Sequence, residues 1–509
     1  MKQIFILVLC AAMLLCGCSA QNGSLDSTTP TYFGDTNAVK PTVPGQEAQA
    51  LSLIYDPTEQ LNPFKSENTA NRALFSLIYQ GLFSVNREYE AEPVLCESYS
   101  ATADLKTYTF YLADALFSDG SRVTANDVVA SLNEAQESRW YGGRLQQVKS
   151  ITVSGEAVVI EMKTPMAELP LLLDIPVVKA SEVNVARPVG SGPYRLELNE
   201  EGASLRRQAA WWCEAKLPVY GDTIALVKGE SPAQIRDAFE FEGVSMVVAD
   251  PSSDRYVDFR GDYELWNAEN GRMLYLVCNE KSKIFSDPAI RRALTHAIDR
   301  ETLSEQFYHG LARPASLPAS PASPWYNSSL AQRFGYAPEL FAEAVTAAQL
   351  EDNTVTLLLN GDDVIRHRAG LAIADMLRAG GLKVTIVKSS AEDFEENLRY
   401  SEYDLYLGQT KLSANMDISA FFGTNTSLNY GGLADPVLHE MSLAAMTNAG
   451  NFYKLHEAVM EEGQLCPILF LNDAAFVRRG MLPDLSPSRD AVFHYSLGRT
   501  LEDALITEE

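Results

Sequence analysis

The segment DPAIRRALTHAIDRETL, residues 287–303, gathers arginines, carboxylates and a histidine, which are the residue types that acid–base chemistry uses. Its apolar residues favour a different role, because they recur at the intervals of one helical face: Ala289, Ile290, Ala293, Leu294, Ala297 and Ile298. Asp287 is a predicted N-cap with Pro288 in the first helical position, and Asp299 is predicted to cap a second helix. The arginines and the histidine fall off the apolar stripe. We therefore interpret this segment as scaffold, not as a catalytic site.

The rest of the chain carries no recognised catalytic or metal-binding motif. The patterns G-x-S-x-G, G-x-x-x-x-G-K-[ST] and H-E-x-x-H are absent. The six histidines are never spaced so that two share a helical face: residues 296, 309, 367, 439, 456 and 494. Cys96, Cys213, Cys278 and Cys466 form no C-x-x-C pair, and they leave two alternatives open, two disulfides or free buried thiols. We predict no enzyme activity, no cofactor and no metal site.

The first residues, MKQIFILVLCAAMLLCGC, predict export from the cytoplasm. Lys2 is followed by an apolar run, residues 4–15, which is too short to span a bilayer comfortably. The ending LCGC resembles a bacterial lipobox, and this resemblance implies a signal peptide of residues 1–17 and a lipid on Cys18. Residues 18–50 contain this cysteine and a stretch rich in Ser, Thr, Asn, Gly and Pro, which predicts a flexible tether. The body of the protein is expected to be extracytoplasmic and lipid-anchored to the membrane, at the cell surface or in the periplasm.

Composition limits the partners of this body. The chain has 509 residues, 67 acidic and 41 basic, and a formal net charge of −26. This balance argues against nucleic acid as a partner, because phosphate binding needs clustered Lys and Arg. Hydrophobic residues make up 46% of the sequence, which suits a large globular protein with more than one core. After the leader, no stretch has the eighteen or so apolar residues that a membrane helix needs.

Ordered helix and strand units provide the most specific signal. The alternating TYTFYL predicts a strand, Asp119 and Gly120 a turn, and Thr124 the N-cap of a helix. The ordered motifs DPTEQLNP, LIYQGLF, DLKTYTFYLADALFSDGSRVTANDVVASL, GSGPYRL, WWCEAKLPVYGDTI and DPAIRRALTHAIDRETL follow one another along the chain. In this order they resemble the large extracellular solute-binding proteins of the oligopeptide, dipeptide and nickel transport class, family 5. The resemblance covers roughly residues 50–480.

The resemblance implies an α/β fold of the periplasmic-binding-protein-like type II class, with two lobes joined by a two-segment hinge. Lobe I is expected at residues 51–272, with an extra subdomain at about 84–185, and lobe II at residues 280–462. Residues 463–509 are expected to return through the hinge to lobe I. The hinge segments themselves are expected near MLYLVCN, residues 273–279, and CPILFLND, residues 466–473.

The resemblance also implies a function. The chain is expected to be the substrate-binding lipoprotein of an ABC importer, a monomer that captures a peptide or peptide-like solute between its lobes. Permease and ATPase subunits are expected on separate chains, because this sequence has neither membrane helices in its body nor a P-loop. The alternatives are a metal-chelate or haem binder on the same fold, or, less favoured, a secreted enzyme.

The site residues follow partly from the resemblance. In peptide-binding relatives, a loop after a Tyr-Asp-hydrophobic strand carries Trp and then an Asp that holds the peptide amine, but residues 403–422 place Lys411 near the Trp position and Ala414 or Asn415 at the Asp position. Asp417 is the expected substitute. The predicted ligand-binding residues are Glu67, Asn68, Arg272, Tyr275, Gln409, Lys411, Asn415 and Asp417.

Overall fold

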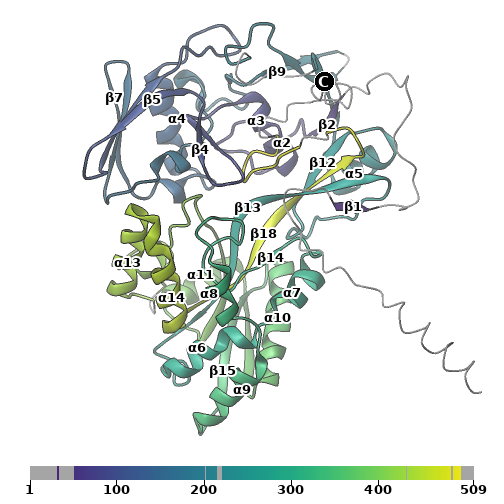
Figure 1. The fold of residues 1–509 in the computed structure, drawn as a ribbon. Helices are drawn as coiled ribbons and strands as arrows, with labels where there is room; N and C mark the ends of the chain where they lie inside the picture. The colour runs from purple at the N-terminus through teal and green to yellow at the C-terminus, as the bar shows by residue number, and fades with distance from the viewer. Residues whose placement is uncertain are drawn as a thin grey trace, which may run out of the picture.

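Two lobes are built on one continuous β-sheet in the computed structural model (Figure 1). The structure describes residues 31–33, 51–200, 202–214, 221–430, 433–482 and 485–493. The predicted signal peptide, Cys18 and nearly all of the tether lie outside these residues. Within the described residues, no helix is both long and apolar enough to cross a membrane.

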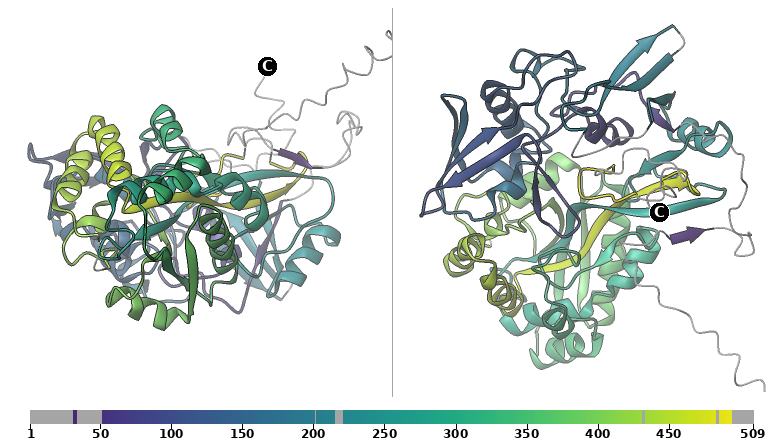
Figure 2. Two further views of the ribbon diagram at one scale, coloured as in Figure 1. Left: turned by 90° about the horizontal axis from the view of Figure 1, so that it is seen from below. Right: turned by 45° about the horizontal axis from the view of Figure 1, so that its top comes forward.

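Two long strands connect the lobes. Strands β13 (Tyr263–Cys278) and β18 (Leu465–Arg478) pair antiparallel along most of their length. These two strands lie at the centre of the sheet, whose order is β16 (Lys383–Ser389), β15 (Thr354–Asn360), β17 (Leu405–Lys411), β13, β18, β12 (Met246–Ala249), β2 (Ser52–Tyr55), β11 (Thr223–Lys228), β10 (Gly202–Arg207) and β9 (Tyr194–Asn199). Figure 2 shows the pair from two further directions. Their residues are almost continuously buried, as expected for strands that are covered on both faces. We call β13 and β18 the hinge strands.

Lobe I occupies one end of this sheet. Its strands are β2 (Ser52–Tyr55), β9 (Tyr194–Asn199), β10 (Gly202–Arg207), β11 (Thr223–Lys228) and β12 (Met246–Ala249), and β1 (Thr31–Phe33) pairs with β13. Helices α2 (Thr69–Ala73), α3 (Phe75–Ile78) and α5 (Pro232–Phe241) accompany them. Lobe I thereby presents the ends of α2 and β12 beside the hinge strands.

A separate antiparallel sheet projects from lobe I. It contains β5 (Cys96–Ala101), β6 (Thr107–Leu112), β7 (Val148–Ser154) and β8 (Ala157–Met162), with α4 (Ala125–Glu137) packed against it, and β3 (Phe83–Val85) and β4 (Ala91–Pro93) form a hairpin nearby. Strand β6 is TYTFYL, as predicted. Thr124 caps α4, and its hydroxyl and amide both donate to Asp127. This arrangement confirms the predicted strand and helix start.

Lobe II occupies the other end of the sheet. Strands β15 (Thr354–Asn360), β16 (Lys383–Ser389) and β17 (Leu405–Lys411) join β13, and β14 (Arg313–Pro314) pairs with β18. The helices of this lobe are α6 (Pro288–Ala297), α7 (Arg300–Phe307), α8 (Ser328–Arg333), α9 (Pro338–Ala347), α10 (Val364–Ala379), α11 (Ala391–Arg399), α12 (Ser419–Phe422), α13 (Pro436–Thr447) and α14 (Phe452–Glu462). Parallel pairing of β15 with β16 and β17 requires crossover helices, which α10 and α11 supply.

The 287–303 segment is the scaffold that its apolar pattern predicted. Asp287 accepts a hydrogen bond from Ala289 N at the start of α6, and Asp299 accepts one from Thr302 N in α7. Arg291 is buried although it falls off the apolar stripe, and its guanidinium donates to backbone carbonyls. Arg300 is likewise buried and donates to the carbonyls of four residues: Thr295, Ile298, Ala315 and Pro467.

The lobes touch each other away from the hinge. The amide of Ala167 in lobe I donates to the carbonyl of Met446 in α13 at 2.8 Å, and Tyr89 of lobe I meets Trp325 of lobe II edge to face, with ring centroids 5.8 Å apart. Figure 1 shows α13 and α14 beneath the projecting sheet of lobe I. The structure is therefore a closed arrangement of the two lobes.

The four cysteines of the body have free thiols and are buried: Cys96, Cys213, Cys278 and Cys466. The sequence left open two disulfides or free buried thiols, and the structure contains free buried thiols. Burial raises the pKa of the Cys278 thiol well above its ordinary value, which keeps this sulfur protonated.

Replacing Arg300 by Met is expected to lower the free energy of unfolding by at least about 3 kcal/mol, because several buried carbonyls lose their donor together. The matched change Arg292→Met, at an exposed position on the same segment, is expected to shift it by no more than about 0.5 kcal/mol. Urea unfolding measures both. Equal effects of the two changes would contradict the scaffold interpretation.

Candidate functional site

A cavity of about 520 Å³ lies where the hinge strands enter lobe I. Its lining comes from lobe I, both hinge strands, the end of β17 and the C-terminal segment, residues 485–493. A second cavity of about 430 Å³ continues into lobe I and shares five lining residues with the first: Glu67, Thr69, Trp140, Val248 and Asp250. We call the two together the interlobe cavity.

An arginine between two aspartates forms the base of this cavity. Arg272 Nη2 lies 2.8 Å from Asp250 Oδ1 and 3.1 Å from Asp473 Oδ1, and Arg272 Nη1 donates to Ser252 Oγ. The order of the strands brings these three residues together. Arg272 is on β13, Asp473 is on the adjacent β18, and Asp250 directly follows β12, which is the next strand in the sheet. Asn270 also donates to Asp473 Oδ1, at 3.0 Å.

The two aspartates share a single cation and retain negative charge. Burial and then the neighbouring Asp250 raise the pKa of Asp473 to about 6, although Arg272 opposes the shift. Burial also raises the pKa of Asp250, but Arg272 outweighs burial and brings the pKa below its ordinary value. Among the described residues, no hydrogen bond reaches Oδ2 of either carboxylate. The pair can therefore accept hydrogen bonds from a cationic group in the cavity.

A chain of ion pairs crosses from lobe I to lobe II on another wall. Arg144 lies between Asp174 and Asp490, and Asp490 also pairs with Lys411 at the end of β17. Burial lowers the pKa of Lys411 to about 8, although Asp490 acts in the opposite direction. Burial raises the pKa of Asp490, but Lys411 and Arg144 outweigh it and hold this pKa well below the ordinary value. The C-terminal segment thus connects the two lobes electrostatically.

Two further cations of the cavity, Arg72 and Arg139, lie near α2. The Arg72 guanidinium is 3.9 Å from the centroid of the Trp140 ring, close enough for a cation–π interaction. Within the part of the chain that the structure describes, no carboxylate is within 4.0 Å of Arg72. Arg139 pairs with Glu67 at the exposed rim. Arg72 Nη1 donates to the carbonyls of Pro63 and Ser66, and because these partners are neutral, the charge of Arg72 remains for an anionic group of a ligand.

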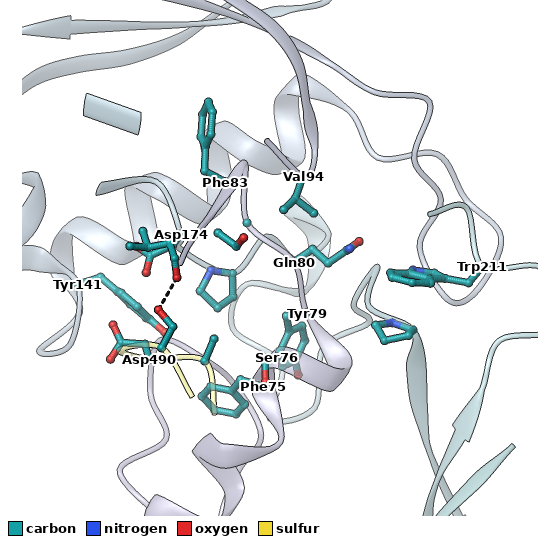
Figure 3. Close-up of a pocket in the computed structure, with 17 residues that line it drawn as sticks. Phe75, Ser76, Tyr79, Gln80, Phe83, Val94, Tyr141, Asp174, Trp211 and Asp490 are labelled. Atoms are coloured by element: carbon teal, nitrogen blue, oxygen red, sulfur yellow. Dashed lines mark hydrogen bonds between the residues drawn. The ribbon is translucent and has the colours of Figure 1, made fainter. Parts of the chain in front are cut away.

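A separate aromatic cavity of about 90 Å³ lies inside lobe I. Figure 3 shows Tyr141, Asp174 and Asp490 together at one end of it and Trp211 at the other, with Phe75 and Tyr79 between them. Asp490 also lines the interlobe cavity, so its ion pairs form part of the wall between the two spaces.

Five of the eight ligand-binding residues that the sequence predicted line the interlobe cavity: Glu67, Asn68, Arg272, Gln409 and Lys411. The other three do not line it. Tyr275 is buried in lobe II, with its ring 5.0 Å from that of Phe421. Asn415 is buried against the sulfurs of Met166 and Met446. Asp417 accepts a hydrogen bond from Ser419 N at the start of α12, and burial raises its pKa.

Sequence reasoning missed several residues that line this cavity: Arg72, Trp140, Asp250, Asn270, Asp473, Arg489 and Asp490. One signal was present, because Asp473 interrupts the apolar run of CPILFLNDAAF, where a charge in a buried strand needs a partner. Asn270 lies within β13, and the others stand on helix ends and loops that no local pattern marks.

A closed, two-lobed body with a polar cavity at its hinge defines a binding protein of the periplasmic type. Residues 90–431 match the family described as bacterial extracellular solute-binding proteins, family 5. The chain belongs to this family, which comprises substrate-binding components of transporters and is not an enzyme family.

Individual relatives agree with the family. The chain is 26% identical over 323 residues to the glutathione-binding protein GsiB of Salmonella typhi, covering 58% of this chain and 61% of that protein. Its fold is similar to the oligopeptide-binding protein AppA from Bacillus subtilis in complex with a nonapeptide, with a TM-score of 0.62, 18% identity and coverage of 88% and 98% of the two chains. It is also similar to NikA from Brucella suis in complex with Fe(III)-EDTA, with a TM-score of 0.70, 19% identity and coverage of 88% and 99%.

Replacing Asp490 by Asn is expected to lower the free energy of unfolding by about 3–5 kcal/mol, because it removes the carboxylate that Lys411 and Arg144 share in a buried site. The matched change Asp262→Asn breaks an exposed pair with Arg479 and is expected to cost less than about 1 kcal/mol. Denaturant unfolding measures both. A small effect at Asp490 would show that these ion pairs do not stabilise the closed arrangement.

Proposed function

We propose that this chain is the substrate-binding lipoprotein of an ABC importer and that it captures a peptide or peptide-like solute in the interlobe cavity. The observation that carries the proposal is a cavity between two lobes with separated, incompletely paired charges, Asp250 and Asp473 on one side and Arg72 on another. Family membership supports the transport role.

Recognition follows from these charges. A ligand ammonium fits against the free Oδ2 atoms of Asp250 and Asp473, and a ligand carboxylate fits against Arg72 beside Trp140. Both ends need a partner, because a charged group enclosed without one costs several kcal/mol. Closure of the lobes around the solute then excludes water, and no covalent step is required.

Delivery needs partners and a location outside the cytoplasm. In this proposal a monomeric chain is held at the membrane by a lipid on Cys18 and passes its solute to a permease and an ATPase on separate chains. Glu67, Asn68, Gln409 and Lys411 supply further polar contacts to the solute.

A metal chelate is the second candidate, since a structural neighbour was solved with Fe(III)-EDTA. No histidine is among the described residues that line the interlobe cavity. Imidazole is the commonest metal ligand in proteins, so its absence from the described lining favours a peptide-like solute over a chelate recognised through direct metal contact.

Mass spectrometry of the small molecules released by denaturing the gently purified protein tests the proposed function. A closed cavity retains a tight ligand, so we expect short peptides or a single peptide-like zwitterion. A metal chelate would replace the peptide proposal and leave the transport role intact. An empty protein whose Tm is unchanged by libraries of peptides, glycans and chelates would contradict both.

Asp473→Asn is expected to weaken binding of an ammonium-bearing peptide at least about tenfold at pH 7.5, because it removes a counter-charge from the enclosed site. In the unaltered protein the affinity should fall as pH drops through about 6, the pKa of Asp473, since protonation removes the same charge. The variant should lose this pH dependence.

The matched control is Asp417→Asn, which removes a carboxylate outside the cavity but keeps an oxygen that accepts from Ser419 N. Its affinity and pH dependence should equal those of the unaltered protein. Isothermal titration calorimetry from pH 5 to pH 8 measures all three proteins. If Asp417→Asn weakens binding and Asp473→Asn does not, the amine is held by the loop that the sequence indicated.

A further inference from the structure

The aromatic cavity inside lobe I lies behind a wall of the interlobe cavity. The two spaces share one described lining residue, Asp490, whose carboxylate pairs with both Arg144 and Lys411. These buried ion pairs hold the shared wall in place. The aromatic cavity is therefore a space separate from the proposed solute site.

One side of helix α3 supplies part of the lining. The intervals between Phe75, Ser76 and Tyr79 place these residues on the same side of the helix, and all three line the cavity (Figure 3). The hydroxyl of Tyr79 donates to the carbonyl of Leu61 at 2.8 Å, so it is the ring of Tyr79 that remains for the cavity. This wall offers aromatic surface against which a planar ligand can pack.

The segment GSGPY, residues 190–194, fixes another wall of the cavity. A Cβ at Gly190 would overlap with the carbonyl oxygen of Ile78, and a Cβ at Gly192 would lie 2.5 Å from the carbonyl carbon of the same residue. Glycine therefore permits the close approach of this segment to the end of α3. Between the two glycines, the carbonyl of Ser191 accepts a hydrogen bond from Trp211 Nε1 at 2.9 Å, which orients the indole ring that lines the cavity.

Two polar atoms of the lining are left for a ligand. Ser76 Oγ is buried and has no hydrogen-bond partner among the described residues. Asp174 Oδ1 accepts from Arg144, whereas no hydrogen bond from another described residue reaches Asp174 Oδ2. A buried hydroxyl without a partner destabilises the fold, and a ligand that bonds to it removes this cost.

The charges around the cavity favour a neutral ligand. Two carboxylates line it, Asp174 and Asp490, and three cations oppose them: Arg144, Lys411 and Arg489. Burial raises the pKa of Asp174, Arg144 opposes this rise, and Asp490 adds to it. A cationic ligand would find no uncompensated carboxylate here, and an anionic ligand would lie against two carboxylates.

We propose that the aromatic cavity binds a neutral five-membered aromatic ring that carries an N–H group, of the kind found in pyrazole. The volume sets the size, because an engineered cavity that holds benzene measures about 150 Å³ and this cavity measures about 90 Å³. The ring packs against Phe75 and Tyr79, and its two nitrogens form hydrogen bonds with Ser76 Oγ and Asp174 Oδ2.

Ligand-observed NMR titration of the purified protein with matched ring compounds tests the proposal. Pyrazole is expected to bind at least about tenfold more tightly than thiophene, which has the same ring size but no N–H group. Indazole, in which a second ring is fused to pyrazole, should bind at least about tenfold more weakly than pyrazole because the cavity is too small for two rings. Equal binding of pyrazole and thiophene, or binding of neither, would overturn the proposal.

The variant Ser76→Ala removes the unpartnered hydroxyl and should weaken pyrazole binding about threefold to tenfold while leaving thiophene binding unchanged. The matched control is Ser66→Ala, because Ser66 Oγ is also buried without a described partner but Ser66 does not line the cavity. Its pyrazole affinity should equal that of the unaltered protein. Equal effects of the two variants on pyrazole binding would contradict the assigned site.

Crystals soaked in pyrazole provide a second measurement that does not depend on a variant. Density for the ring beside Ser76 supports the site, and density confined to other parts of the molecule overturns it.

The variant Asp473→Asn separates this site from the proposed transport function. It alters the interlobe cavity and should leave the pyrazole affinity unchanged. Loss of pyrazole binding in this variant would place the ring in the interlobe cavity and overturn the second site. Absence of pyrazole binding from the unaltered protein, together with intact peptide binding, would reject the second site and leave the transport function standing.

Discussion

The antiparallel pairing of β13 with β18 sets where both lobes and the interlobe cavity lie. Because β13 and β18 are shared by both lobes and buried on both faces, any charged side chain on them must find a partner from another element. Arg272 and Asp473 satisfy this requirement by pairing with each other. Asp250 also pairs with Arg272, because it follows β12, the next strand in the sheet. The polar base of the interlobe cavity is thus a consequence of sheet order.

The C-terminal segment, residues 485–493, lines the interlobe cavity together with the hinge strands. Asp490 pairs with Lys411 of lobe II and Arg144 of lobe I, and Arg489 reaches the carbonyl of Leu412 beside the hinge. Contacts of this kind form only when both lobes are close. The segment therefore contributes to the closed arrangement as well as to the cavity wall, and it separates the interlobe cavity from the aromatic cavity inside lobe I.

The loop at residues 403–422 shows how a family pattern can be replaced. Ala414 and Asn415 are the two residues expected at the position where peptide-binding relatives carry an aspartate, and both are buried. The nearby Asp417 accepts a hydrogen bond at the start of α12. Negative charge beside the cavity comes instead from a hinge strand and from the end of β12. A ligand amine can be held from either side of an enclosed site, since Coulomb attraction depends on distance and burial and not on which segment carries the charge.

The sequence by itself determined the family, the two-lobed α/β class, the strand at β6, the caps of α4, α6 and α7, and the scaffold role of residues 287–303. These features depend on local patterns, namely apolar periodicity, capping residues and the order of motifs. It also predicted five residues that line the interlobe cavity: Glu67, Asn68, Arg272, Gln409 and Lys411. The folded structure was needed to show that Asp250, Asp473, Arg72 and Trp140 also line this cavity. It was needed as well to show that Tyr275, Asn415 and Asp417 do not. The physical reason is that a charge-bearing cavity is made by residues far apart in sequence, whose side-chain directions are set by strand register and lobe packing.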